Sequence, residues 1–237
     1  MILSLVLAAA DLSGQTAAQA PAKPKTPAIW ELEWAYQSRY HDANLALPAP
    51  APSRPRVVFM GDSITEGWMG ADAGFFSSSG YLDRGISGQT TSQMLVRFRQ
   101  DVIDLDPAVV VILGGTNDVA RNGGIIPPEL TEENLQSMVE LARLHGIRPI
   151  LCSILPAGDF PWRRGLAPAP KIAALNHWIA SYCASNGVAY LDYYSSLDDG
   201  SGALKAALSA DGVHPNAAGY SVMEPLARQA IAGVLKK

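Results

Sequence analysis

This sequence of 237 residues has few cysteines, few histidines and a small net charge. The two cysteines lie in different contexts, Cys152 in an apolar run and Cys183 in a helical pattern, so we expect buried free thiols rather than a disulfide framework. The formal net charge is −4, and the basic residues are scattered, so no positive field is available for a phosphate backbone. These shortages argue against redox chemistry and against a nucleic-acid partner.

Long apolar runs are also missing. The apolar start, residues 1–10, is too short to span a membrane, and no later segment has the length of a transmembrane helix. The small residues of Ala-Gln-Ala at 18–20 have the spacing of a signal-peptidase site, although no Lys or Arg precedes the apolar run. We expect residues 1–24 to be a signal peptide or a tail, which favours a periplasmic or secreted protein over a cytoplasmic one, without stable membrane insertion.

Proline and alanine mark the boundary of a second segment. Residues 25–54, the N-terminal arm, have stretches rich in Pro and Ala at both ends, which is typical of linkers. Between these stretches, aromatic residues recur near helical spacing and predict a short amphipathic helix over 29–44. The rest of the chain, residues 55–237, is long enough to form one domain with a sizeable core.

Short apolar runs alternate with longer segments of helical period from residue 56 onward, which is typical of parallel β-α-β units. The expected strands are 57–60, 81–84, 109–113, 149–155 and 188–191, the second being the weakest. The expected helices are 91–105, 131–145, 171–185 and 216–235, with Thr131 as the N-cap of the second. This order predicts a three-layer α/β/α domain with a mostly parallel, five-stranded sheet. Ligands bind beyond the carboxyl ends of such strands, so the residues that follow each strand matter most.

Ser63 follows the first expected strand, in the segment GDSITEG at 61–67. A turn from this strand into a helix would present the Ser63 hydroxyl and backbone N–H at the positive end of the helix, where an oxyanion is stabilised. Thr65 departs from the G-x-S-x-G elbow of α/β-hydrolases, so a different serine scaffold is needed. Taken alone, the segment is explained as well by a serine that caps a helix.

A nucleophilic serine needs an adjacent base, usually a histidine held in one tautomer by a carboxylate. Of the four histidines, His41 lies in the arm, and His145 and His177 lie in helical patterns. His214 lies in a loop before the last expected helix, three residues after Asp211, and a proline stiffens the chain behind it. His214 and Asp211 are therefore the candidate base and orienting carboxylate.

Two loops offer hydrogen-bond donors for the oxyanion of acyl transfer. Gly88, in GISGQT at 85–90, permits close backbone approach and offers its N–H. Asn117, in GGTND at 114–118, offers a side-chain amide. The structural alternative is an ordinary glycine turn for Gly88 and a helix cap for Asn117. Because both loops follow strands, a parallel sheet would gather them along one edge with Ser63.

As a set, these segments resemble the SGNH, or GDSL, hydrolase family. The resemblance rests on GDS at 61–63, Gly88, GTND at 115–118 and DGVHP at 211–215. It implies a flavodoxin-like fold, Ser63 as nucleophile, Asp211 and His214 as the rest of a triad, and an oxyanion hole of Ser63, Gly88 and Asn117. The fourth letter of the GDSL signature is Ile64 here, a conservative apolar change. The N-terminal arm lies outside the resemblance.

The implied enzyme is an ester hydrolase that works through an acyl-enzyme and needs no metal or organic cofactor. The sequence has no His, Cys and carboxylate cluster at metal spacing, and its Gly-rich stretches lack the Lys of a phosphate loop. Aromatic and basic residues near Ser63 and in a later loop are candidates to line the substrate site, with local packing as the alternative: Trp68, Phe75, Phe76, Phe160, Trp162, Arg163 and Arg164.

A short-acyl ester, such as an O-acetyl group on a carbohydrate, is the favoured substrate because no long apolar lid is evident in the sequence. A thioesterase or a lysophospholipase is the alternative with the same triad. A noncatalytic carbohydrate-binding module on this fold is the alternative from another class, since a fold does not establish an activity.

Overall fold

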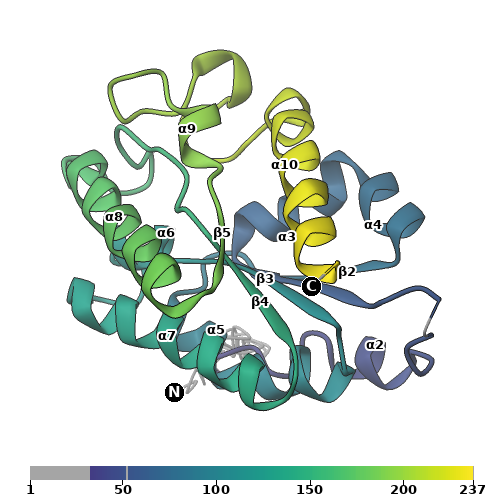
Figure 1. Ribbon diagram of the computed structural model, residues 1–237. Helices are drawn as coiled ribbons and strands as arrows, with labels where there is room; N and C mark the ends of the chain where they lie inside the picture. Colours follow the sequence, from purple (N-terminus) through teal and green to yellow (C-terminus); the bar gives the residue numbers. More distant parts are fainter. Residues whose placement is uncertain (1–32, 52, 237) are drawn as a thin grey trace, which may run out of the picture.

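The computed structural model describes residues 33–51 and 53–236. A five-stranded sheet in the order β2-β1-β3-β4-β5 forms its centre, and every neighbouring pair of strands is parallel (Figure 1). The strands are β1 (Val57–Gly61), β2 (Tyr81–Gly85), β3 (Val109–Leu113), β4 (Arg148–Cys152) and β5 (Ala189–Leu191). All five expected strands are therefore present, the weak second one included, and the stretch expected as 149–155 ends as a strand at Cys152.

Helices cover both faces of this sheet. They are α2 (His41–Leu45), α3 (Ser63–Ala71), α4 (Ala73–Ser79), α5 (Thr91–Asp101), α6 (Thr116–Val119), α7 (Pro128–Leu144), α8 (Pro168–Asn186), α9 (Tyr194–Leu197) and α10 (Ala217–Leu235). One core lies between the sheet and α5, α7 and α8, and a second lies between the sheet and α3, α4 and α10 (Figure 1). The structure thus confirms the predicted three-layer α/β/α architecture.

The apolar runs of the sequence follow from this double coverage. Along β1, Val58 and Met60 belong to the first core, whereas Val57 and Phe59 belong to the second. Alternate side chains point to opposite faces of a strand, so a strand covered on both sides is apolar at every position. Because β1 lies between β2 and β3, the turn that follows it, and hence Ser63, lies at the carboxyl edge of the sheet between the loops that follow those two strands.

Helix α5 ends at Asp101, short of the predicted residue 105, and α8 begins at Pro168, before the predicted residue 171. Two further helix predictions also need correction. Helix α7 begins at Pro128 and not at Thr131, because proline suits the first turn of a helix, where its missing N–H costs nothing. Thr131 is buried within α7, and its hydroxyl donates to Asp118. In the arm, the helix expected over 29–44 is present only as α2, preceded by turns from residue 34; residues 29–32 lie outside the described part of the chain.

The cysteines and the chain ends complete the comparison with the sequence. Cys152 and Cys183 are both buried and free, as predicted. The segment expected to be a signal peptide or tail, residues 1–24, lies outside the described residues. Within residues 33–51 and 53–236, none of the helices has the length and apolar character needed to cross a membrane.

Candidate active site

Ser63 is the first residue of α3, directly beyond the carboxyl end of β1. Asp62 caps the helix by accepting an N–H of its first turn at 2.9 Å. The turn requires glycine at position 61, since a Cβ there would lie 2.0 Å from Thr65 Oγ1 and 2.9 Å from the Leu113 carbonyl oxygen. The local sequence therefore forces a close contact between β1 and α3, which leaves the Ser63 side chain half-buried at the sheet edge.

A chain of hydrogen bonds joins Ser63 to the loop before α10. Ser63 Oγ lies 2.9 Å from His214 Nε2, across 151 residues of sequence. His214 Nδ1 lies 2.6 Å from Asp211 Oδ2, and Asp211 Oδ1 accepts the backbone N–H groups of Val213 and His214 at 2.9 and 2.8 Å. The three residues expected to form a triad are thus brought together in the expected order.

The charge of Asp211 determines the tautomer of His214. Burial acts to raise the pKa of Asp211, but the hydrogen bonds from the His214 ring and from two backbone N–H groups outweigh it and lower the pKa to about 2. An ionised carboxylate only accepts hydrogen bonds, so His214 Nδ1 carries a proton. In the neutral ring, Nε2 is then the acceptor, and it faces the Ser63 hydroxyl.

The two loops with the candidate oxyanion donors meet beside Ser63. Asn117, at the start of α6, donates from Nδ2 to Asp62 Oδ2 at 3.2 Å and to the Gln89 carbonyl oxygen at 3.0 Å. Its amide therefore links the turn of Ser63 to the loop of Gly88. Gly88 is exposed with φ of 79°, and nothing lies within 4 Å of the place a Cβ would occupy. A ligand can approach this backbone closely.

Two residues that the sequence analysis did not single out hold Asn117 in place. Burial raises the pKa of Asp62 to about 6, against the hydrogen bond from the Ile64 N–H and the nearby His214, and this carboxyl group receives the Asn117 amide. Asn122 donates to Asn117 Oδ1 at 2.5 Å, which directs the amide nitrogen of Asn117 toward Asp62. Only the position of Asn122, just after the GTND segment, hinted at such a contact.

An exposed tryptophan forms a wall beside the histidine. The ring of Trp162, 44% exposed, lies 5.9 Å from the His214 ring, and its Nε1 donates to Asn122 Oδ1 at 3.1 Å. Phe160 is fully buried beneath it, with ring centroids 5.3 Å apart. The loop between β4 and α8 thus reaches the site through Trp162, and Phe160 supports that ring and has no surface of its own for a substrate. Arg163 is exposed on the same loop.

The aromatic residues just after Ser63 do not line the site. Trp68 is 2% exposed, stacks on Phe75 at 4.5 Å and on Tyr220 at 5.4 Å, and belongs to the core under α3, α4 and α10. Phe75 and Phe76 are buried in the same core. The expectation of a substrate wall here is wrong, because a residue five positions after Ser63 lies about 140° around the helix and faces the sheet.

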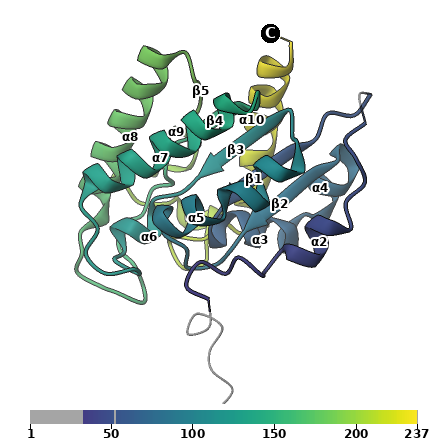
Figure 2. The ribbon, with the colours of Figure 1, turned by 90° about the horizontal axis from the view of Figure 1, so that it is seen from below.

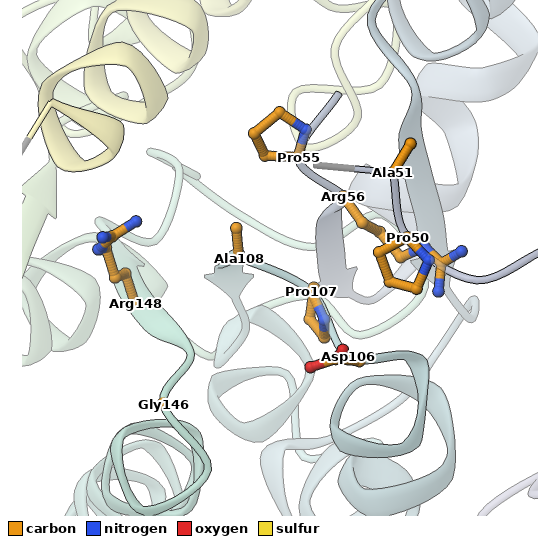
Figure 3. A pocket seen from close by; sticks show the side chains of 9 residues that line it. All are labelled: Pro50, Ala51, Pro55, Arg56, Asp106, Pro107, Ala108, Gly146 and Arg148. Atoms are coloured by element: carbon orange, nitrogen blue, oxygen red, sulfur yellow. The ribbon is translucent and has the colours of Figure 1, made fainter. Parts of the chain in front are cut away.

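Two cavities lie at opposite ends of the sheet. One, of about 260 Å³, lies beside Asp211 and is lined by Gly158, Asp159, Pro161, Arg164, Ala203, Asp211 and Gly212. The other, of about 380 Å³, lies at the amino-terminal ends of β1, β3 and β4, between the arm and the loops shown in Figure 3. There Arg56 donates to the carbonyl groups of Leu105 and Pro48. Of the hydrogen-bonded serine, histidine and aspartate, Asp211 lines the first cavity, and none of the three lines the second.

This fold and this site define the class of protein, a serine hydrolase of three-layer α/β/α fold with hydrogen-bonded serine, histidine and aspartate at the carboxyl edge of a parallel sheet. Residues 59–222 match the GDSL-like Lipase/Acylhydrolase family. The chain belongs to that family and is an ester-hydrolysing enzyme. Within the described residues, no group of three or more His, Cys, Asp or Glu is placed to hold a metal ion.

Solved structures and curated relatives agree with this assignment. A protein from Bacteroides fragilis is 50% identical, with a TM-score of 0.84, over 86% of this chain and 99% of that one. A GDSL-like lipase from Bacteroides thetaiotaomicron is 47% identical, with a TM-score of 0.83, over 85% and 99%. Esterase TesA of Pseudomonas aeruginosa is 29% identical over 67% of this chain and 79% of its own length. The lipoprotein YqeF of Bacillus subtilis is 40% identical over 78 residues, only 32% of its length.

Proposed function

We propose that this enzyme hydrolyses short-chain acyl esters, such as O-acetyl groups on carbohydrates, through an acyl-enzyme on Ser63. The observation that carries the mechanism is the unbroken hydrogen-bonded chain from Ser63 through His214 to Asp211. It is the arrangement in which a histidine can take the proton of a serine hydroxyl while a carboxylate stabilises the imidazolium that forms.

In the proposed reaction, Ser63 Oγ attacks the ester carbonyl carbon while His214 Nε2 takes the hydroxyl proton. The tetrahedral intermediate collapses, His214 returns the proton to the departing alcohol, and the acyl group remains on Ser63. Water, deprotonated by His214, then attacks the carbonyl carbon of the acyl-enzyme. The second intermediate collapses, His214 returns the proton to Ser63 Oγ, and the acid is released. Asp211 stays ionised throughout. In each tetrahedral intermediate the negative charge lies on the former carbonyl oxygen, while His214 is an imidazolium paired with Asp211.

The backbone N–H groups of Ser63 and Gly88 and the amide of Asn117 are the proposed donors to the oxyanion. Each such donor is worth roughly 10²- to 10³-fold in kcat in enzymes of this kind. The longer of the two Asn117 bonds, at 3.2 Å to Asp62, is the one with which the oxyanion would compete. Asn122 would keep the amide nitrogen, and not its oxygen, turned toward the intermediate.

A short acyl group on a sugar suits the surroundings of His214. The exposed Trp162 ring offers a flat apolar face of the kind on which a sugar ring packs. The cavity of about 260 Å³ beside Asp211 has Asp159 and Arg164 in its wall, which can hydrogen-bond to hydroxyl groups. Trp162 and this cavity are therefore the proposed alcohol side of the site.

A second candidate, a thioesterase or lysophospholipase, is favoured by a different cavity. It measures about 240 Å³, lies behind the loop of Asn117, and is lined mainly by apolar residues of the α6–α7 segment and by Leu175. Arg121 and Lys171 lie in the same wall. A longer acyl chain would fit an apolar cavity of this kind, with the two cations near an anionic headgroup.

The test is hydrolysis of an aryl ester series from acetate to decanoate by the wild type, Ser63→Ala and His214→Ala, with Ser221→Ala and His177→Ala as matched exposed controls. We expect each site variant to lose about 10³-fold or more in kcat/KM, with both controls unchanged. A preference for acetate, together with release of acetate from acetylated sugars, supports the first candidate; preference for long chains, acyl-CoA or lysolipid supports the second. Full activity of Ser63→Ala would refute the mechanism. Sugar binding without turnover of any ester by the wild type would indicate a noncatalytic module.

We further propose that the protein is exported. The support is the apolar start followed by Ala-Gln-Ala at 18–20, and the name of the relative YqeF, a lipoprotein. Sequencing the N-terminus of the protein from a periplasmic or culture fraction tests this, since an unprocessed Met1 in a cytoplasmic fraction would contradict it.

A further inference from the structure

The described part of the N-terminal arm, residues 33–51 and 53–54, lies outside the matched family segment and contacts the loop that carries Gly88. We call residues 85–90 the oxyanion loop. At its start, the hydroxyl of Tyr40 donates to the Gly85 carbonyl oxygen at 2.5 Å. Near its end, the side-chain amide of Gln89 donates to the Ala35 carbonyl oxygen at 2.8 Å. The arm therefore binds both ends of the oxyanion loop, and Figure 2 shows its helix α2 along the β2 edge of the sheet.

Gln89 joins the arm to two further parts of the site. Its side chain is 1% exposed, and its Oε1 accepts a hydrogen bond from Arg97 Nε at 2.5 Å. Its backbone carbonyl oxygen accepts the Asn117 amide at 3.0 Å. Gln89 is thus held by the arm, by α5 and by Asn117 at once, and it directly follows Gly88, whose N–H is the proposed donor.

Arg97 extends this connection to the turn of Ser63. Its side chain is fully buried, pairs with Asp101 at 2.9 Å, and donates to the Gly61 carbonyl oxygen at 2.9 Å, two residues before Ser63. Asp101 in turn accepts a hydrogen bond from Asn44 of the arm at 2.8 Å. A buried charge keeps its place only when all its partners are present, so these contacts form one rigid network.

The middle of the oxyanion loop is held from α3. Glu66 accepts the backbone N–H of Ser87 at 2.9 Å and also the Ser87 hydroxyl. Arg39 of the arm lies 3.3 Å from the other oxygen of Glu66. Gly88 has a positive φ and no side chain, and there is open space where a Cβ would lie, so no side-chain contact of its own fixes it. Its orientation depends on the anchored residues on either side.

We propose that the N-terminal arm is a positioning element for the oxyanion hole: it holds the Gly88 N–H and, through the Gln89 carbonyl, the Asn117 amide in the orientation that the intermediate needs. This inference rests on the proposed function of Ser63, Gly88 and Asn117. The stabilisation of an oxyanion requires donors that are already oriented, and small displacements of them are costly to the rate. Gln89 and Tyr40 are accordingly positioning residues, which touch no substrate.

Gln89→Glu removes one contact between the arm and the oxyanion loop. Glutamate keeps an acceptor for Arg97, beside which its carboxylate would lie, but has no N–H for the Ala35 carbonyl oxygen; the arm keeps its contacts through Tyr40, Asn44 and Arg39. Gln100→Glu is the matched control, because Gln100 also donates its amide to an arm carbonyl, that of Gln37, but from α5 and away from the oxyanion loop. Tyr40→Phe is a second, milder variant that removes only the bond to Gly85.

The measurements are kcat and KM on an aryl acetate and the inhibition constant of phenylboronic acid, which forms a tetrahedral adduct with a catalytic serine. We expect Gln89→Glu to lose about 10- to 100-fold in kcat and in boronate affinity, with KM within about twofold, and Tyr40→Phe to change in the same direction. Gln100→Glu should stay within about twofold throughout. Thermal denaturation establishes that each variant is folded at the assay temperature.

Two results would overturn the inference. One is a wild-type kcat and boronate affinity in both single variants, Gln89→Glu and Tyr40→Phe, each shown to be folded. The other is an equal loss in Gln100→Glu, which would mean that the arm acts on stability and not on the oxyanion loop. Neither result touches the proposed function, which fails only if Ser63→Ala retains activity.

Discussion

Asp83, on β2, offers a direct test of how burial controls charge in this protein. Its Oδ1 accepts the Gly85 N–H at 2.6 Å, and its Oδ2 has no hydrogen-bond partner among the described residues. Burial raises the pKa of Asp83 from 3.8 to about 7; the charge of Glu66 adds to the shift, while the Gly85 hydrogen bond and the charges of Arg84 and Arg97 oppose it. This carboxyl group is therefore partly protonated at neutral pH.

The sign of the stability change follows from proton binding. Between pH 4 and 7 the folded protein holds the Asp83 proton more tightly than the unfolded chain does, so the free energy of unfolding falls as the pH rises. The contribution is complete below pH 3.8 and is lost as the pH rises through about 7. Since one unit of pKa is about 1.4 kcal/mol, the loss between pH 5 and pH 8 is at most about 2–3 kcal/mol.

Urea denaturation of the wild type and Asp83→Asn at pH 5, 6, 7 and 8 measures this contribution. Asparagine keeps the acceptor for Gly85 but cannot ionise, so the stability of the variant relative to the wild type should rise by about 2–3 kcal/mol from pH 5 to pH 8. Asp104→Asn, at a side chain 57% exposed, is the control and should follow the wild type. If Asp83→Asn keeps the wild-type slope, the account of a buried, neutral Asp83 is wrong.

Three further outcomes follow from the site and the turn before it. Asp211→Asn should lower kcat by roughly 10³- to 10⁴-fold while the protein stays folded, because His214 loses the carboxylate that sets its tautomer; a change below tenfold would remove Asp211 from the mechanism. Trp162→Ala should raise KM for an acetylated sugar several-fold but leave a small aryl acetate nearly unchanged, with Trp178→Ala, on α8, as the control; equal effects on both substrates would contradict a role in sugar binding. Gly61→Ala should destabilise the protein by about 1–3 kcal/mol or more in urea denaturation, since its Cβ would lie 2.9 Å from a backbone oxygen. The control is Gly70→Ala, whose Cβ would have no atom within 4 Å and which should be neutral or stabilising.

Much of the fold could be predicted because it depends on local patterns. Each strand is a short apolar run bounded by turn residues, and the coverage of both sheet faces makes these runs apolar throughout. Boundaries were less predictable. Thr131 has the side chain of an N-cap, but Pro128 starts the helix earlier, and only the folded chain shows that the Thr131 hydroxyl is used by Asp118.

The candidate site likewise has residues that could be predicted from the sequence and residues that could not. Ser63, Gly88 and Asn117 could be proposed from short segments, because the turn after a parallel strand places its residues at one edge of the sheet. Asp211 and His214 could be proposed because they lie three residues apart in one loop before the last helix. Which of the aromatic residues line the site could not be predicted from the sequence. Trp68 lies close to Ser63 in sequence and Trp162 lies far from every site segment, yet Trp68 is 2% exposed in the core and Trp162 is 44% exposed beside His214.

The sequence by itself determined the succession of strands and helices along the chain, the positions of the catalytic segments and the family that these segments resemble. All of these depend on residue type at short spacing. Only the tertiary structure decided which side chains complete the site. Gln89 meets Ala35 across 54 residues, and Trp162 meets Asn122 across 40. Hydrogen bonds and burial across such separations depend on how distant segments pack, and no local pattern records that packing.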